Sequence, residues 1–258
     1  MLPTFCDSHA HLNDDQFSGD LSAVLDRSRQ AGITRIVNVG YDVGSSVRAL
    51  EQATNHDLLV CSVGLHPHDA SQFTPQLVDF LDSLAADPRV VAIGETGLDK
   101  YYNHSPFGIQ VEAFEAHLEL AEKLRLPSVI HCRAAYPELC GLLEKIHRPE
   151  HAPWQVHCFS GDSRDLDRLI ALGCYFSIGG TATFKNFKSQ ELIARIPADR
   201  LLLETDCPYL APAPKRGVKR NEPAFLQFTA EIVAGIRGES LEELSRVTNE
   251  NFARIFGA

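Results

Sequence analysis

Residues 4–12 read TFCDSHAHL, a short apolar run that leads into Asp7, His9 and His11. Residues two apart lie on the same face of a β-strand, so a carboxylate and two imidazoles line one side of the strand end. Imidazole is the commonest nitrogen ligand for zinc-like metals. The His-x-His pair therefore predicts a metal site, although Asp7 or His9 alone would fit a surface turn better. The prediction depends on further ligands at the ends of other strands.

Seven more short apolar runs follow this one, and amphipathic stretches separate them. The segments that we expect to be strands are 4–9, 33–40, 58–64, 90–96, 127–132, 154–160, 174–179 and 201–206. Helical spacing of apolar residues is clear in 19–32 and 114–125, and a last helix is expected over 241–256. Strands that alternate with helices form a parallel sheet, and eight such units in about 250 residues fit a closed barrel. We expect the whole chain, 1–258, to form a single (β/α)8 TIM barrel with an additional C-terminal helix.

The composition sets limits on the function. The chain has 258 residues, of which 44% are hydrophobic and 22% charged, and its net charge is −10. Such a surface does not attract nucleic acid as a whole. No apolar run reaches the length of a membrane span, and no signal peptide is visible. The seven cysteines have no disulfide-like spacing and fit a reducing compartment. We therefore expect a cytoplasmic protein without a membrane partner, monomeric or weakly oligomeric.

Further polar residues lie at the ends of other expected strands. In a barrel the carboxyl ends of all strands meet at one mouth, the face that hosts active sites. We therefore expect six side chains to gather there as metal ligands: His9, His11, Glu95, His131, His157 and Asp206. Adjacent strand residues point to opposite faces, so Cys132, Cys158 and Cys207 are expected to be buried apolar residues rather than ligands.

Seven motifs spread over nearly the whole chain carry a family resemblance. They are DSHAHL (7–12), GLHPH (64–68), IGETGLD (93–99), IHCR (130–133), HCFSG (157–161), ETDCPYLAP (204–212) and NEP (221–223). Together they resemble the motifs of the TatD family of metal-dependent deoxyribonucleases, within the amidohydrolase-like barrels. The resemblance implies a TIM barrel, a divalent metal centre and hydrolysis of nucleic-acid phosphodiesters.

The same resemblance implies roles for individual residues. One metal would be held by His9, His11, Glu95 and Asp206, and a second by Glu95, His131 and His157. Asp7 and Glu204 would orient ligands. His66 would contact the substrate phosphate or protonate the leaving group; a solvated turn at Pro67 is the equal alternative. Mixed nitrogen and oxygen ligands suit Zn, Mn, Mg, Fe or Co, so the identity of the metal stays open.

Two divalent cations that share a carboxylate suit an in-line displacement at phosphorus. Asp206 is then the candidate general base. Arg133 is a candidate phosphate contact. Ser160 and Gly161 precede an expected helix, whose first N–H groups could hold a phosphate, but an ordinary N-cap by Ser160 or Asp162 is equally expected.

Basic and aromatic residues follow the seventh and eighth expected strands. The basic residues are Lys185, Lys188, Lys215, Arg216, Lys219 and Arg220, and the aromatic residues are Phe184, Phe187 and Tyr209. Cations beside aromatic rings suit a single-stranded DNA end, although solvated loops are the alternative. We therefore predict an exonuclease-type deoxyribonuclease with DNA as its substrate. The alternatives are a hydrolase of small esters, lactones or amides, and a non-catalytic binding module, against which the full ligand set argues.

Overall fold

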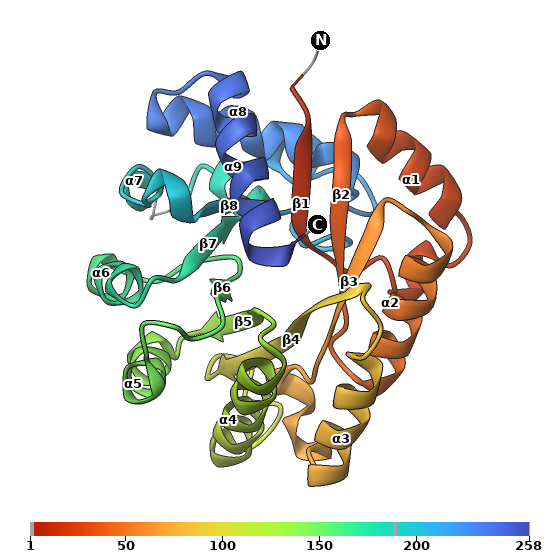
Figure 1. The fold of residues 1–258 in the computed structure, drawn as a ribbon. Helices are drawn as coiled ribbons and strands as arrows, with labels where there is room; N and C mark the ends of the chain where they lie inside the picture. The colour runs from red at the N-terminus through yellow and green to blue at the C-terminus, as the bar shows by residue number, and fades with distance from the viewer. Residues whose placement is uncertain (1–2, 188–189, 258) are drawn as a thin grey trace.

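The computed structural model describes residues 3–187 and 190–257, which form a barrel of parallel strands surrounded by helices (Figure 1). The strands are β1 (Phe5–Ala10), β2 (Ile33–Val39), β3 (Leu59–Val63), β4 (Val90–Asp99), β5 (Ser128–Arg133), β6 (Trp154–Val156), β7 (Tyr175–Ile178) and β8 (Leu201–Leu203). The helices are α1 (Leu21–Gln30), α2 (Val43–Asn55), α3 (Pro75–Leu84), α4 (Phe107–Leu124), α5 (Tyr136–Ile146), α6 (Ser163–Ala171), α7 (Gln190–Ile193), α8 (Leu226–Arg237) and α9 (Leu241–Phe256).

The strands pair in sequence order from β1 to β8, and every pair is parallel. Hydrogen bonds close the seam between the first and last strands. The N–H of Asp206 donates to the carbonyl of His9 at 2.9 Å, and the N–H of His11 donates to the carbonyl of Cys207 at 2.7 Å. The expected (β/α)8 barrel is thereby confirmed, as is the additional C-terminal helix, α9.

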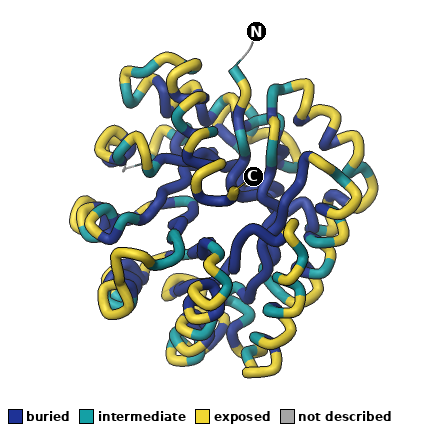
Figure 2. Tube along the Cα trace, in the orientation of Figure 1, coloured by how far each residue is buried: buried dark blue, intermediate teal, exposed yellow. Residues whose placement is uncertain are grey.

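Helix α9 covers the end of the barrel where the strands begin (Figure 1). The side chain of Asn249 accepts a hydrogen bond from the N–H of Cys6, and Asn251 donates to the carbonyl of Leu201. Phe252 and Phe256 pack against apolar residues of the barrel interior. The strands and the inner faces of the helices are buried, whereas the outer faces are exposed (Figure 2). The carboxyl ends of the strands are thus the end that α9 leaves free.

Several strand boundaries differ from the sequence-based prediction. The sixth and eighth strands, expected to end at 160 and 206, end at Val156 and Leu203. The first strand, expected over 4–9, is observed one residue later, as Phe5–Ala10, and contains Asp7 and His9. Glu95 was expected at the end of the fourth strand, but β4 continues through Asp99. The longer β4 carries two carboxylates, of Glu95 and Asp99, to the same end of the barrel. None of the described helices is both long enough and apolar enough to cross a lipid bilayer.

A buried histidine of α4 fixes the loop that follows β3. The Nε2 atom of His117 accepts a hydrogen bond from the N–H of Leu65 at 3.1 Å, and its Nδ1–H donates to the carbonyl of Ala113 at 2.6 Å. Burial lowers the pKa of His117 to about 4, so the imidazole is neutral at pH 7. Leu65 directly precedes His66, and His117 therefore holds the start of the GLHPH segment.

We predict that His117→Leu destabilises the protein by about 1–3 kcal/mol at pH 7, because the buried N–H of Leu65 loses its acceptor. The pKa of His117 in the folded protein lies below its unfolded value near 6.5. The stability gained from the neutral imidazole is therefore full above pH 6.5, and it decreases by about 1.4 kcal/mol per unit as the pH falls toward 4. Denaturant unfolding between pH 7 and 4.5 should show the gap between wild type and variant narrowing. His147→Gln, at an exposed position, is the control, and a gap independent of pH would contradict the prediction.

Candidate metal centre and substrate cleft

The first predicted ligand group forms a compact set of buried donor atoms. The Nε2 atoms of His9 and His11 are 3.1 Å apart, and each lies 3.4–3.5 Å from Oε2 of Glu95. Oδ1 of Asp206 lies 3.6 Å from Nε2 of His9 and 3.4 Å from Nε2 of His11. The Nδ1–H of His11 donates to the carbonyl of Val39, which leaves its Nε2 lone pair free for a ligand bond. Four ligands at about 2.0–2.2 Å from one tetrahedral cation would be about 3.3–3.6 Å apart, so this donor set fits a metal ion.

The second predicted group meets at the other oxygen of Glu95. Oε1 lies 3.1 Å from Nδ1 of His131 and 2.8 Å from Nε2 of His157, and these two nitrogens are 3.2 Å apart. Nε2 of His66 approaches the same oxygen at 3.4 Å. One buried carboxylate therefore faces two groups of imidazoles, one with each oxygen. This arrangement suits a bridging ligand between two cations.

The close approach of β4 and β5 places these groups together. Gly97 pairs with His131 in the parallel ladder. Its φ is +140°, and a Cβ atom at Gly97 would lie 2.0 Å from the carbonyl oxygen of His131. Only glycine fits this position without moving β5 away from β4. Gly97, the second glycine of IGETGLD, thus sets the distance between the imidazole of His131 and the carboxylate of Glu95.

The ligand cluster attracts positive charge. Burial would raise the pKa of Glu95, but the imidazoles of His157, His66 and His9 hold that pKa well below its usual value. Burial would likewise lower the pKa of His157, but the charge of Glu95 raises it well above its usual value. Protons and a cation compete for the same lone pairs. Metal affinity is therefore expected to decrease as the pH falls and the imidazoles become protonated.

Asp99 is a functional candidate that the sequence analysis did not identify. Its Oδ2 accepts hydrogen bonds from Nε2 of His131 at 3.1 Å and from Nε2 of His68 at 2.9 Å. A ligand histidine whose second nitrogen donates to a carboxylate has a fixed tautomer and ring orientation. With Nε2–H committed to Asp99, Nδ1 of His131 is the nitrogen that faces Glu95. The available sequence signal was the acidic residue that ends the motif IGETGLD.

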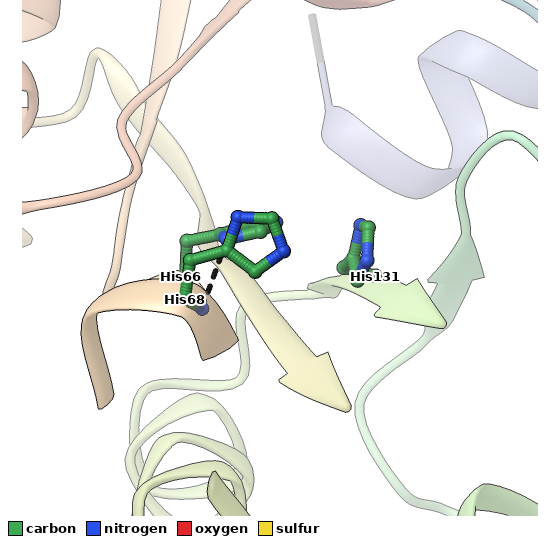
Figure 3. A group of neighbouring side chains, drawn as sticks. All are labelled: His66, His68 and His131. Carbon is green, nitrogen blue, oxygen red and sulfur yellow. Dashed lines mark hydrogen bonds between the residues drawn. The ribbon is translucent and has the colours of Figure 1, made fainter. Parts of the chain in front are cut away.

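His66, His68 and His131 also lie close enough together to hold a cation (Figure 3). Their hydrogen bonds favour another interpretation. Nδ1 of His66 accepts from the N–H of His68 at 3.2 Å, the contact drawn in Figure 3, so the ring proton of neutral His66 is on Nε2. Burial lowers the pKa of His66 to about 4. His66 therefore presents a neutral N–H donor to the centre, while His68 and His131 are held by Asp99.

Asp7 and Glu204 are buried and hold the loops that carry ligands. Oδ1 of Asp7 accepts from the N–H of Thr205 at 2.9 Å and from the N–H of His9 at 3.3 Å. Oε1 of Glu204 accepts from the N–H of Cys158 at 2.8 Å and lies 3.7 Å from Nδ1 of His157. The contacts from Asp7 to Thr205 and from Glu204 to Cys158 join segments that are far apart in sequence.

Two adjoining cavities open over the ligand cluster, and we call them the first and second lobes. The first lobe, about 510 Å³, extends from the ligands toward Tyr41, His66, His68, Asp69, Tyr102, His104 and Tyr209. The second lobe, about 360 Å³, extends from them toward Cys158, Ser160, Thr181, Phe184, Asn186 and Phe187. Both lobes are lined by His131, Arg133, His157, Asp206 and Leu210. Three of the predicted ligands, His131, His157 and Asp206, thus lie with Arg133 where the two lobes meet.

Of the two equal alternatives for the start of α6, a phosphate cradle at Ser160 and Gly161 or an ordinary N-cap, the structure has the N-cap. Asp162 is the N-cap, and its carboxylate accepts from the N–H groups of Arg164 and Asp165. These N–H groups are therefore satisfied within the protein. Ser160 lines the second lobe with its N–H bonded to the hydroxyl oxygen of Tyr136, and Gly161 is buried.

The basic residues after β8 separate into two sets. The guanidinium of Arg216 lies 4.4 Å from the ring centre of Phe184, and Lys215 lies over Phe225 at 5.2 Å. Arg220, in contrast, is bound by the carboxylates of Asp20 and Glu222. The expectation that Arg220 tracks a nucleic acid is therefore wrong, because its guanidinium joins this loop to α1. Lys219 is exposed, and Lys188 lies outside the described residues.

The expected burial of the three cysteines holds for two of them. Cys132 and Cys207 are buried in the apolar core. Cys158 is only partly buried and lines the second lobe, which corrects the prediction. Its φ of +46° shows why strand alternation fails here, since β6 ends at Val156 and the chain turns before Cys158.

Comparison with known proteins identifies the family. The family model described as TatD related DNase matches residues 6–257. The chain belongs to this TatD family. A metal-dependent hydrolase of Bacillus subtilis, YabD, is 39% identical over 97% of this chain and 98% of its own length. The 3′-5′ ssDNA/RNA exonuclease TatD of Erwinia billingiae is 38% identical over 97% of this chain and 98% of its own length.

A solved structure extends the comparison to the fold. The crystal structure of YjjV, a TatD homologue from Escherichia coli K12, superposes with a TM-score of 0.93 at 30% identity, covering 100% of both chains. As a member of the TatD family, the protein is a metal-dependent hydrolase that acts on ester bonds.

We predict that Asp99→Asn weakens the cation affinity of the group around His131 by about 10–100-fold, because the imidazole loses its orienting carboxylate. The group around His9 and His11 should keep its affinity. His131→Ala should abolish binding at the group that contains His131 and spare the group around His9 and His11. Calorimetric titration of the metal-free protein with Mn²⁺, with metal analysis of the loaded protein, measures both sites. Unchanged stoichiometry in His131→Ala would remove His131 from the ligand set.

Proposed function

We propose that the protein is a nuclease that hydrolyses phosphodiester bonds at a single-stranded DNA end, with two divalent cations held by the two groups that share Glu95. The observation that carries the proposal is the bridging geometry, in which each carboxylate oxygen of Glu95 faces a different set of imidazole nitrogens. Cations bound there would neutralise phosphate charge and lower the pKa of a coordinated water.

Asp206 is the proposed general base. Its carboxylate belongs to the group around His9 and His11, and its side chain is 12% exposed at the junction of the two lobes. Burial would raise the pKa of Asp206, but hydrogen bonding to His11 and the neighbouring imidazole charges lower it, so the carboxylate is ionised and able to accept a proton. A base in this position can take the proton of the attacking water.

His66 is the proposed donor to a non-bridging oxygen of the scissile phosphate. The amide of His68 occupies its Nδ1, so its Nε2–H points toward Glu95 and the second ligand group. A neutral N–H fixed before the substrate binds can stabilise charge that develops on phosphate oxygens. This role replaces the alternative of proton donation to the leaving group.

Several features favour a nucleic-acid strand as the substrate. Arg133 lies at the junction of the lobes, and among the described residues no carboxylate is within ion-pair distance of its guanidinium. Phe184 and Arg216 form a ring and cation pair beside the second lobe. Relatives named 3′-5′ ssDNA/RNA exonucleases match almost the full chain. The first lobe combines imidazole, carboxylate and tyrosine side chains with the guanidinium of Arg133.

The direct test is a metal-dependent assay on end-labelled single-stranded DNA, with RNA of the same sequence and a panel of small esters and lactones alongside. We expect stepwise shortening of the DNA that stops when the metal is chelated and resumes when it is restored. Hydrolysis of the esters with intact DNA would contradict the proposal.

We predict that Asp206→Asn folds normally and reduces turnover by about 10²-fold or more, because an amide cannot accept the proton of the attacking water. Substrate affinity should change much less. Metal content must be measured on the same preparation, since a lost cation would also lower turnover. Near-normal turnover with both cations bound would exclude Asp206 as the base.

We predict that His66→Ala lowers turnover by about 10²-fold to an equal extent on substrates with good and poor leaving groups, because the lost hydrogen bond acts on a non-bridging oxygen. A thymidine phosphodiester with a p-nitrophenolate leaving group and one with an alkoxide leaving group provide the comparison. His66→Gln, which retains an N–H donor, should recover part of the loss. A loss confined to the alkoxide substrate would instead assign His66 to protonation of the leaving group.

A further inference from the structure

The loop between β4 and α4 places aromatic rings at the rim of the first lobe. Tyr101 is 63% exposed and Tyr102 is 48% exposed, and both lie within three residues of Asp99. The ring of Tyr102 lies parallel to that of His104, with an interplanar angle of 7° and centres 5.6 Å apart. Of the two tyrosines, Tyr102 lines the first lobe. Large exposed aromatic rings beside a catalytic centre are the usual means of binding unpaired bases.

Hydrogen bonds hold this loop in position at both ends. Oδ1 of Asp99 accepts from the N–H groups of Tyr101 and Tyr102 at 2.8 and 2.9 Å. At the other end, the hydroxyl of Ser105 donates to the carbonyl of His68 at 2.7 Å. Gln110 donates to the carbonyls of Asp99 and Ser105. The rings therefore stand on a fixed backbone, which lowers the entropy cost of stacking a ligand on them.

Arg133 links the rings to the metal centre. Its guanidinium lies 4.2 Å from the ring centre of Tyr101 and 4.7 Å from that of Tyr102. It lines both lobes, whose shared walls also contain His131, His157 and Asp206. A phosphate held at this junction would have one substituent in each lobe. The second lobe offers its own aromatic surface in Phe184 and Phe187.

We propose that the first lobe is a nucleobase subsite, in which the ring of Tyr102 stacks on the base on one side of the scissile phosphate while the second lobe receives the base on the other side. The inference rests on the proposed nuclease function and names the part of the substrate that each lobe holds. Arg133 marks the boundary by binding the phosphate between the two bases. Tyr101 acts as a positioning residue, because it contacts Arg133 from outside the lobe.

The test uses dinucleotide analogues with a single phosphonate linkage, in which CH₂ replaces the leaving oxygen of the phosphodiester. These analogues bind without being cleaved. One ligand has both bases, and two others lack either the 5′ or the 3′ base. Affinities are measured by calorimetry with Mn²⁺-loaded wild type, Tyr102→Ala, Tyr102→Phe and Phe184→Ala. Phe80→Ala, which removes an exposed ring from α3 outside both lobes, is the matched control and should bind like wild type.

We expect Tyr102→Ala to weaken binding of the two-base ligand about ten-fold, and Tyr102→Phe to retain it, since stacking needs the ring and not the hydroxyl. The effect of Tyr102→Ala should vanish on one of the two ligands that lack a base, and that of Phe184→Ala on the other. This crossed pattern distinguishes base stacking from a general loss of structure.

Equal losses on all three ligands, or no loss for Tyr102→Ala, would overturn the subsite. Because these ligands are not cleaved, hydrolysis of single-stranded DNA by the wild-type protein is measured separately. Absence of DNA hydrolysis together with the crossed pattern would reject the nuclease proposal and retain the subsite. DNA hydrolysis without the crossed pattern would retain the nuclease proposal and reject the subsite.

Discussion

The centre depends on one buried carboxylate that faces imidazoles on two sides. Glu95 is 3% exposed, and its two oxygens approach the ring nitrogens of His9 and His11 on one side and of His131 and His157 on the other. A buried anion without partners would be strongly unfavourable, so the surrounding imidazoles and the cations that they fit are needed to stabilise it. The cluster therefore couples metal binding to the packing of the barrel mouth.

The seam between β1 and β8 completes this arrangement. Asp7 binds the backbone and the hydroxyl group of Thr205, and the N–H of Asp206 donates to the carbonyl of His9. These contacts hold Asp206 against the His-x-His pair, although the residues are about 200 positions apart in sequence. Barrel closure and the first ligand group are thus produced by the same hydrogen bonds.

Asp99 connects the predicted ligand His131 to the rim of the cleft. One of its oxygens accepts hydrogen bonds from the imidazoles of His131 and His68. The other accepts hydrogen bonds from the backbone N–H groups of Tyr101 and Tyr102. The orientation of a metal ligand and the position of the aromatic loop therefore share one carboxylate. A ligand that moved the loop would act on the ring of His131 through this residue. The two oxygens of Asp99 thus serve chemistry and substrate placement together.

The sequence by itself determined the barrel and the composition of the ligand set. Alternating strands and helices define a parallel sheet whose carboxyl ends converge, so His9, Glu95, His131 and Asp206 had to meet once the strand order was known. Tertiary structure decided what local patterns leave open. Arg220 pairs with Asp20 and Glu222 instead of facing a substrate, and Asp162 satisfies the amides that could have held a phosphate. Asp99 gained its role only through the extension of β4 beside β5. The N-cap by Asp162 is a local contact, one of the alternatives that the sequence left open. Asp20 and His131, which bind Arg220 and Asp99, are far from them in sequence. Only the fold brings these groups within reach of an ion pair or hydrogen bond, and residue type alone does not specify that geometry.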